Sequence, residues 1–226
     1  RAPSHILEIS QHQVVSNGAY YDKGQCYVTK NGIATPVIGS ADIHIPGSHN
    51  IENILTDIAL AYALGVPVET IHRIISEFHG VEHRLERVKT LDGITFYNDS
   101  KATNVDSVVK ALESFDQSVI LLAGGHDKMT PLEDFMQLVK HHTKAVIFMG
   151  EAADRFEAAA KEAGVQPIYR ASSMKDAVEQ GYKLANQGDI VLLSPACSSF
   201  DWYSCFEERG DDFKNCVHML QEGRHH

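Results

Sequence analysis

The chain has 226 residues, 43% of them hydrophobic, and a formal net charge of -10 at pH 7. Such an acidic balance disfavours nucleic acid and anionic membranes as partners, because both bind basic surfaces. No apolar run approaches the roughly 20 residues that a membrane-spanning helix needs. The composition therefore predicts a cytoplasmic protein that binds neither nucleic acid nor membrane.

The first 46 or so residues contain short β-prone stretches separated by turns. These stretches cover residues 19–21, 25–29, 33–38 and 42–45, and Asn31-Gly32 is typical of a hairpin turn. We interpret them as the last strands of a larger domain.

Two helices are expected between residue 48 and Gly80. Ser48 is a candidate N-cap of the first helix, which should end where Gly65 and Pro67 follow. Each helix should bury one apolar stripe. The stripes comprise Ile51, Ile54, Leu55, Ile58, Ala61 and Tyr62 in the first helix, and Ile71, Ile74, Ile75 and Phe78 in the second.

Strands and helices alternate after Gly80, so we expect two domains, residues 1–80 and 81–226. The pattern predicts strands at 85–89, 94–98, 119–123, 145–149, 168–169 and 189–193, and helices from 105, at 131–141, 152–163 and 174–186, and from 206. Several strands are continuously apolar, which is typical of parallel strands buried on both faces. The sequence thus predicts an α/β protein. A Rossmann-like, doubly wound, mainly parallel sheet should follow the partial end of a second α/β domain.

Polar residues gather where strands of this sheet should end. The heptad 98–104, which reads NDSKATN, joins a strand to a helix, and Gly124-Gly125 and Ser194 follow two other strands. Ligands of such sheets bind beyond the carboxyl ends of the strands. In an extended segment Asp99 and Lys101 would face the same side, and Thr103 could cap the following helix. The alternative is a polar loop that merely begins a helix.

Five further segments accompany the heptad, and together they resemble the Mur ligase family. Within this family, the heptad is similar to the corresponding segment of the ligases that add D-glutamate to UDP-N-acetylmuramoyl-L-alanine. The resemblance covers the chain from about Ala41 onward and implies an ATP-dependent ligase, monomeric when full-length, that forms an amide through an acyl phosphate. The five segments are GSHNIEN at 47–53, HRLE at 83–86, GGHDK at 124–128, LSPACSSFD at 193–201 and FEERG at 206–210.

The resemblance implies that Lys128, Thr103, Ser199 and Phe206 bind D-glutamate. Lys128 follows a glycine pair that lets a ligand approach the backbone, so its ammonium group can pair with a carboxylate. Ser199 lies in a strand exit, where hydroxyl and backbone N–H groups can hold an oxyanion. The alternatives are an ordinary loop lysine at 128 and a core aromatic at 206.

The same resemblance implies that Arg84, Asp99 and Lys101 bind the nucleotide. A carboxylate can accept hydrogen bonds from ribose hydroxyls, and arginine and lysine can stabilise phosphate charge. Asn50 and Asn53 are one helical turn apart, so their amides share a face and could bind an adenine edge. Otherwise they form a polar first helical turn.

Some parts of a Mur ligase have no counterpart in the sequence. No phosphate loop of the form G-x-x-x-x-G-K-[ST] occurs, and 226 residues suit about one and a half domains of typical size. We therefore expect the C-terminal half of a ligase whose cofactors are ATP and Mg²⁺, with most magnesium ligands outside this chain and no activity in this chain alone. The histidines and cysteines show no metal-site spacing, and the cysteines should be reduced thiols.

Two other functions remain open. The chain could belong to another amide ligase of the superfamily, such as one for a different amino acid or a folylpolyglutamate synthase. It could also be a non-catalytic ligand-binding module.

Overall fold

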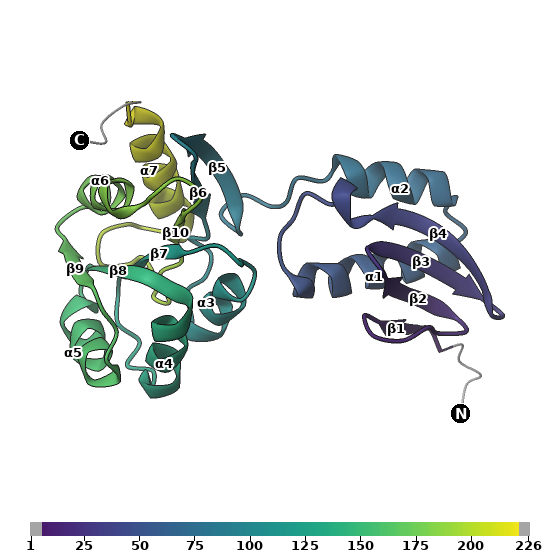
Figure 1. Cartoon of the computed structure of the whole chain (residues 1–226), viewed down its shortest axis with the longest axis horizontal. Helices are drawn as coiled ribbons and strands as arrows, with labels where there is room; N and C mark the ends of the chain where they lie inside the picture. The colour runs from purple at the N-terminus through teal and green to yellow at the C-terminus, as the bar shows by residue number, and fades with distance from the viewer. Residues whose placement is uncertain (1–5, 222–226) are drawn as a thin grey trace. The chain divides into compact units, whose positions relative to one another are not determined.

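The structure is a computed structural model that describes residues 6–221 (Figure 1). The chain divides into two compact units, residues 1–80 and residues 81–226, and each has its own sheet and its own core. Among the described residues, no helix has both the length and the apolar character needed to cross a bilayer.

The first unit combines a four-stranded sheet with two helices. Its strands are β1 (Glu8–Ser10), β2 (Gly18–Asp22), β3 (Gln25–Lys30) and β4 (Ile33–Gly39), in the spatial order β1-β2-β3-β4. β1 and β2 are parallel, and the other neighbouring pairs are antiparallel. After β4 come the short 3-10 helix η1 (Ser40–Asp42) and the helices α1 (Ser48–Ala63) and α2 (Val68–Glu77). Apolar residues of both α-helices share one core with the sheet.

Most of the expected elements of this unit are present. Asn31 and Gly32 connect β3 to β4 with φ angles of 52° and 76°, as the hairpin signal predicted. The stripe of α1 is buried at Ile54, Leu55 and Ile58. Alternation of apolar and polar residues therefore predicted the elements that form the core of this unit.

Three expectations for this unit are wrong in detail. Residues 42–45 form no strand, because the chain turns through η1 directly after β4. Ser48 is the first residue of α1 and its N-cap is Gly47, which offers no side chain for capping. Ile74 and Phe78 are 54% and 44% exposed, so the buried face of α2 is narrower than its apolar stripe.

The second unit contains a six-stranded sheet and five helices. The strands are β5 (Glu86–Leu91), β6 (Ile94–Asn98), β7 (Val119–Gly124), β8 (Thr143–Met149), β9 (Ile168–Ala171) and β10 (Ile190–Leu193), in the order β5-β6-β10-β7-β8-β9. β5 pairs antiparallel with β6, and every other neighbouring pair is parallel. The helices are α3 (Val105–Leu112), α4 (Glu133–His142), α5 (Ala153–Ala163), α6 (Met174–Leu184) and α7 (Phe206–Met219).

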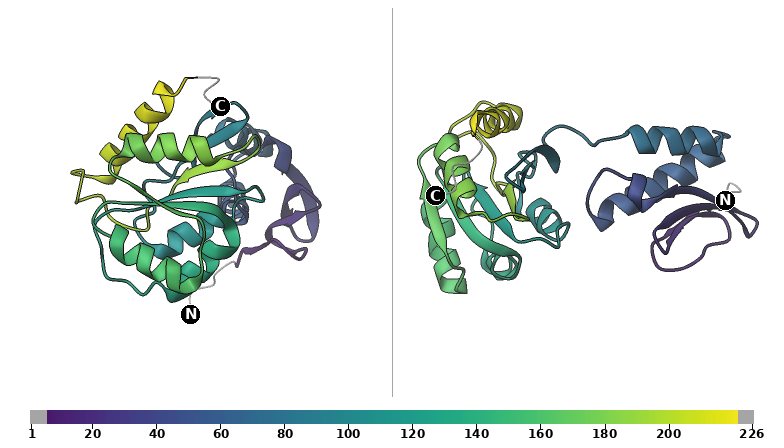
Figure 2. Two further views of the ribbon diagram at one scale, coloured as in Figure 1. Left: turned by 60° about the vertical axis from the view of Figure 1, so that its left-hand side comes forward. Right: turned by 45° about the horizontal axis from the view of Figure 1, so that its top comes forward.

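Helices cover both faces of this sheet, as the left view of Figure 2 shows. α3, α4 and α5 pack on one face in a core with residues such as Leu121 and Phe148. α6 and α7 pack on the other face against Ile120 and Val191. Successive residues of β7 and β10 alternate between these two cores, which explains why both strands are apolar at every position. The predicted fold class, a doubly wound and mainly parallel sheet, is confirmed.

Candidate functional site

The chain reverses its direction of winding at the centre of the sheet. β10 lies between β6 and β7, and its carboxyl end leads to α7 on one face, while β6 and β7 lead to α3 and α4 on the other. Loops that leave neighbouring strands toward opposite faces create the switch point where α/β proteins bind ligands. We call the three loops at this edge the rim: residues 99–104, 124–130 and 194–206.

Asp99, at the exit of β6, is buried rather than exposed to a ligand. It is 4% exposed; its Oδ2 accepts a hydrogen bond from Ser194 Oγ at 2.7 Å, and its Oδ1 accepts one from Leu85 N at 3.2 Å. Burial raises the pKa of this carboxyl group to about 7, although both hydrogen bonds and the positive charge of Arg84 favour the ionised form. Asp99 thus joins the loops that follow β6 and β10.

Lys101 does not share the side of Asp99, contrary to the expectation from an extended segment. Residues 100 and 101 form a turn, so the ammonium group of Lys101 is exposed while Asp99 faces inward. Lys101 Nζ lies 5.8 Å from the centroid of the Phe206 ring, within the range of a cation–π contact. The turn therefore presents a cation at the rim and buries the neighbouring carboxyl group.

Thr103 and Lys128, from two different rim loops, are in contact. Lys128 Nζ donates a hydrogen bond to the backbone oxygen of Thr103 at 2.8 Å, and the lysine is exposed. The sequence predicts Thr103 as the cap of α3, and this prediction is wrong. Asn104 is the N-cap, and its side chain accepts a hydrogen bond from Ser107 N at 2.9 Å. Because the cap comes from the next residue, the Thr103 side chain is not needed to begin the helix.

The glycine pair after β7 lets two rim loops approach closely. Gly125 has a φ angle of +136°, and a Cβ atom there would lie 2.4 Å from the backbone oxygen of Ser198. The next residue, His126, donates its N–H to that oxygen at 2.9 Å, and its ring contacts Glu151 at 2.7 Å. The contacts fix the segment from which Lys128 projects.

The carboxylate beside Lys128 already has a partner. Asp127 accepts two hydrogen bonds of 2.6 Å from the Arg155 guanidinium group, which hold the pKa of Asp127 below its usual value. The ammonium group of Lys128 is therefore not neutralised by its neighbour in sequence.

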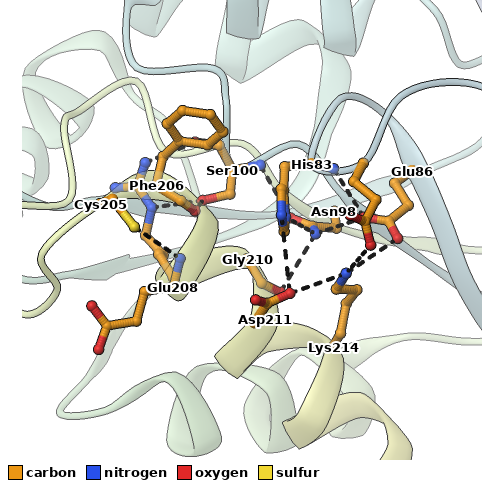
Figure 3. A network of polar contacts seen from close by, with 12 residues as sticks. His83, Glu86, Asn98, Ser100, Cys205, Phe206, Glu208, Gly210, Asp211 and Lys214 are labelled. Atoms are coloured by element: carbon orange, nitrogen blue, oxygen red, sulfur yellow. Dashed lines mark hydrogen bonds and ion pairs between the residues drawn. The ribbon is translucent and has the colours of Figure 1, made fainter.

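Ser199 lies in the middle of the loop between β10 and α7, and Phe206 is the first residue of α7. Ser199 is buried, and its backbone oxygen accepts from Trp202 N and Tyr203 N at 3.2 and 2.9 Å. Phe206 is half-buried and belongs to neither core of the unit. Its backbone oxygen accepts from Ser100 Oγ at 2.7 Å (Figure 3). The first turn of α7 is thus attached to the loop after β6.

Arg209 is a buried residue for which the sequence suggested no role. It is 2% exposed and lies one turn after Phe206 on α7. Its Nε donates to Ser100 Oγ at 3.0 Å, and its Nη2 donates to the backbone oxygens of Ser100 and Cys197 at 2.9 and 3.1 Å. Only the FEERG segment could have drawn attention to it, because its partners lie far away in sequence.

A second polar network fixes the segment before β5 (Figure 3). His83 is buried, and its Nδ1 lies 3.0 Å from Asn98 Nδ2, which also donates to Glu86 at 2.9 Å. Since an amide nitrogen only donates, Nδ1 must accept and the ring proton is on Nε2. Gly210 has to be glycine here, because a Cβ atom would lie 2.1 Å from His83 Nδ1. Lys214 bridges Glu86 and Asp211 at 3.5 and 3.1 Å.

The proposed nucleotide residues divide between the two units. Arg84 follows His83, is exposed, and lies close enough to Asp99 to lower its pKa. Asn50 and Asn53 belong to α1 of the first unit and do share a face, since Asn53 Nδ2 donates to Asn50 Oδ1 at 3.3 Å. Asn50 Nδ2 in turn donates to Pro46 O at 2.6 Å.

Residues 6–221 contain no group of three or more histidine, cysteine, aspartate or glutamate side chains arranged to hold a metal ion. All four cysteines are free thiols. Burial raises the pKa of Cys197, which lies at the rim, to about 12, so this thiol is protonated at neutral pH.

Comparison with known families assigns the second unit. The family model described as "Mur ligase, glutamate ligase domain" matches residues 83–197, about half of the chain. The chain belongs to the Mur ligase family.

Curated Mur ligases from several bacteria are similar to nearly the whole chain. Proteins named UDP-N-acetylmuramoylalanine--D-glutamate ligase from Clostridioides difficile (strain 630) and Bacillus subtilis (strain 168) are 38% and 41% identical over 216 residues, 96% of this chain. The protein of that name from Geobacillus kaustophilus is 44% identical over 94% of the chain. The alignments cover 48%, 47% and 46% of these proteins, so the chain spans about half the length of the curated relatives it matches.

Solved structures of other Mur ligases and of a related ligase share the fold. UDP-N-acetylmuramate-alanine ligase MurC from Thermotoga maritima matches with a TM-score of 0.62 at 15% identity, over 86% of this chain and 43% of that one. MurF ligase from the same organism, in complex with ADP, matches with a TM-score of 0.55 at 14% identity over 90% and 46%. Folylpolyglutamate synthase from Mycobacterium tuberculosis, complexed with ADP, gives 0.62 at 14% over 84% and 44%.

Proposed function

We propose that this chain is part of an ATP-dependent ligase that adds D-glutamate to UDP-N-acetylmuramoyl-L-alanine in peptidoglycan precursor synthesis. In this proposal the second unit supplies the D-glutamate-binding residues, and both units contribute residues that bind ATP. The observation that carries it is the similarity, at 37 to 44% identity over 94 to 98% of the chain, to proteins named for that activity.

The contacts at the rim support an amino-acid site for D-glutamate. Lys128 and Thr103 are brought together by a hydrogen bond. Ser199 lies in the loop that follows the neighbouring strand β10, and Phe206 begins α7 at the end of that loop. A lysine ammonium group has three donors, so Lys128 Nζ retains donors for a carboxylate while it contacts Thr103. Lysine, hydroxyls and backbone groups from three loops suit a ligand with two carboxylates.

The charges of the rim also favour an acidic ligand. The Asp127 carboxylate is paired with Arg155, and the raised pKa of Asp99 leaves that group partly protonated at neutral pH. A third rim carboxylate, Asp201, accepts a hydrogen bond from Glu151 N. Against it stand the exposed ammonium groups of Lys128 and Lys101, and the Arg209 guanidinium group, which makes no ion pair with a carboxylate of residues 6–221. A dicarboxylate at the rim would therefore meet more positive than negative charge.

In this proposal Arg84, Asp99 and Lys101 of the second unit and Asn50 and Asn53 of the first unit contribute to ATP binding. ATP supplies the phosphoryl group that activates the alanine carboxylate. Arg84 and Lys101 would stabilise phosphate charge, whereas the two asparagine amides would contact the base. Asp99 would need to release one of its two present hydrogen-bond donors, Ser194 or Leu85, before it could accept from a ribose hydroxyl. We place most Mg²⁺ ligands outside this chain.

The residues of this chain would act by binding and orientation. In the amide-forming step the amino group of D-glutamate attacks the acyl carbon of the acyl phosphate, the bond from that carbon to the phosphate oxygen breaks, and inorganic phosphate and a proton leave. The two glutamate carboxylates must therefore be held while the amine stays unprotonated and free. Lys128 would hold one carboxylate at the rim by charge, and the buried Ser199 would help to orient the other. We assign residues 1–80 to the end of a central ATP-binding domain and expect the full-length enzyme to be cytoplasmic and monomeric.

Other amide ligases are less well supported. The structural neighbours with other printed activities, including MurC and folylpolyglutamate synthase, are 12 to 16% identical and support the fold alone. A non-catalytic binding module would have the same fold, and only an activity measurement separates it from an enzyme.

The test is substrate selection by the complete ligase that contains this chain. Purified enzyme is supplied with ATP, Mg²⁺ and UDP-N-acetylmuramoyl-L-alanine, and phosphate release is followed with D-glutamate, L-glutamate, D-alanine or meso-diaminopimelate. We expect release above background with D-glutamate alone. Equal or faster phosphate release with another amino acid would make that amino acid the substrate. If none of the amino acids causes phosphate release, the chain is better explained as a non-catalytic binding module.

A further inference from the structure

The guanidinium group of Arg209 is positively charged and buried, and no carboxylate in the described part of the chain is in ion-pair contact with it. Its side chain is 2% exposed. Burial lowers the pKa of Arg209 to about 10, so the guanidinium group is still charged at neutral pH. Removing such a charge from water is unfavourable, and the fold must gain something from its presence there.

The hydrogen bonds of Arg209 join three of the four segments that carry the proposed D-glutamate residues; the fourth, the loop after β7, carries Lys128. Nε and Nη2 hold the hydroxyl and the backbone oxygen of Ser100, in the loop after β6, and Nη2 also holds the backbone oxygen of Cys197, in the loop after β10. Arg209 itself belongs to the first turns of α7, which carry Phe206. Ser100 Oγ completes the connection by donating to the Phe206 backbone oxygen.

Each of these partners is close in sequence to a residue of the proposed site. Ser100 precedes Thr103 by three residues, and Cys197 precedes Ser199 by two. Strand pairing fixes the directions in which the loops after β6 and β10 leave the sheet, but it does not fix their separation from α7. The Arg209 bonds fix that separation.

Lysine could not make the same set of contacts. The guanidinium group offers five donors in a rigid plane, which lets two nitrogens bond Ser100 Oγ, Ser100 O and Cys197 O together. An ammonium group presents its three donors from a single point at the end of a flexible stem.

The remaining guanidinium nitrogen of Arg209, Nη1, has no hydrogen-bond partner within residues 6–221. A Cβ atom at Gly125 would lie 3.0 Å from this nitrogen.

We propose that Arg209, acting through Ser100, is a positioning residue for amino-acid binding, because it sets the distance between the loops of the rim and the start of α7. This proposal rests on the proposed function. It assigns to Arg209 no contact with substrate: the buried guanidinium group acts through the backbone of the segments that carry Thr103, Ser199 and Phe206.

The test compares three variants of the complete ligase. Arg209→Lys keeps the charge and removes the planar fork, and Ser100→Ala removes the hydroxyl that joins Arg209 to Phe206. Lys144→Met is the matched control, because Lys144 Nζ makes a partly buried 2.6 Å ion pair with Asp189 at the opposite, amino end of the strands. Thermal unfolding is recorded for each variant, and kinetics are measured at a temperature where all remain folded.

We expect Arg209→Lys and Ser100→Ala to raise the Michaelis constant for D-glutamate roughly tenfold, since small displacements of binding groups have large kinetic effects. Lys144→Met should lower thermal stability without changing that constant. If Arg209→Lys does not fold, Ser100→Ala alone decides, as the loss of one hydroxyl leaves the core intact. A Michaelis constant for D-glutamate within twofold of wild type in Ser100→Ala would overturn the positioning role.

A second measurement is independent of activity. In the 226-residue chain the Nε proton of Arg209 should exchange slowly with solvent in NMR spectra, because it is buried and bonded to Ser100. Ser100→Ala should accelerate that exchange at least tenfold and shift the amide signals of Phe206. Rapid exchange in the wild-type chain would refute the contact itself. If wild-type ligase does not use D-glutamate at all while exchange is slow, the proposed function fails and the contact stands.

Discussion

Replacing Lys128 by methionine should weaken the use of D-glutamate by the complete ligase. The change keeps the approximate length of the side chain and removes its charge. Lys128 Nζ contacts Thr103 O at 2.8 Å, and the neighbouring Asp127 is paired with Arg155. The charge of Lys128 is therefore available to a ligand carboxylate. Removing this charge leaves no protein carboxylate without its partner.

The magnitude follows from the bond that is lost. A hydrogen bond to a charged group contributes about 1.5 to 3 kcal/mol, and each 1.4 kcal/mol changes affinity tenfold. Because Lys128 is exposed and its charge is screened by water, we expect the lower part of the resulting range of roughly tenfold to a hundredfold. The Michaelis constants for ATP and for the muramoyl substrate should change far less.

Steady-state phosphate release at varied D-glutamate concentrations measures the effect. Lys140→Met is a matched control, since Lys140 Nζ is also exposed and also donates to a backbone oxygen, that of Ala163 at 3.1 Å. That contact joins the carboxyl ends of α4 and α5, away from the rim. If Lys128→Met and Lys140→Met have the same kinetic constants, Lys128 is an ordinary loop lysine that does not bind D-glutamate.

Three further predictions concern the chain itself. Burial raises the pKa of Asp99 to about 7, above the value of about 3.9 in an unfolded chain. Between these two pKa values the folded state binds more protons than the unfolded state. The folded state therefore loses stability as the pH rises from about 3.9 to about 7. Urea unfolding should show wild type falling in stability relative to Asp99→Asn between about pH 4.5 and about pH 7.5; parallel pH profiles would contradict this. Gly210→Ala should be less stable than Gly181→Ala by about 1 to 3 kcal/mol, as the new Cβ lies 2.1 Å from His83 Nδ1 in one case and 2.9 Å from a Val191 methyl in the other. Replacing glycine by alanine in a helix is favourable by about 1 kcal/mol at both positions, so only the contacts of the new Cβ atoms differ. Equal stability of the two variants in urea would mean that His83 can move away from the new Cβ atom at little cost. The 226-residue chain alone should not hydrolyse ATP, because its sequence has no phosphate loop; substrate-dependent phosphate release at the rate of a complete ligase would show otherwise.

The architecture of the second unit follows from local sequence patterns. Continuous apolar runs such as 119–122 and 190–193 identified strands buried on both faces, and alternation with helical patterns identified a parallel sheet. Polar residues directly after three strands then predicted a common edge, because parallel strands end together. The order of the strands placed β6, β10 and β7 side by side at that edge.

Details that depend on distant residues could not be predicted. Asp99 looks like an exposed loop carboxylate in the sequence, but its partner Ser194 is 95 residues away. The role of Arg209 depends on Ser100, 109 residues earlier. The sequence predicts Thr103 as the cap of α3, but the next residue, Asn104, is the N-cap, which depends on the local backbone geometry. Local patterns define elements, whereas side-chain contacts between loops depend on the assembled sheet.

Binding of D-glutamate at the rim can be observed in a structure of the complete ligase with that amino acid. Crystals would be grown with D-glutamate, a non-hydrolysable ATP analogue and the muramoyl substrate. We predict density for a dicarboxylate at the rim, with one carboxylate in contact with Lys128 Nζ and the other with groups of Thr103, Ser199 or Phe206. A well-ordered D-glutamate bound elsewhere, with Lys128 still in contact only with Thr103, would show that the rim is not the D-glutamate site.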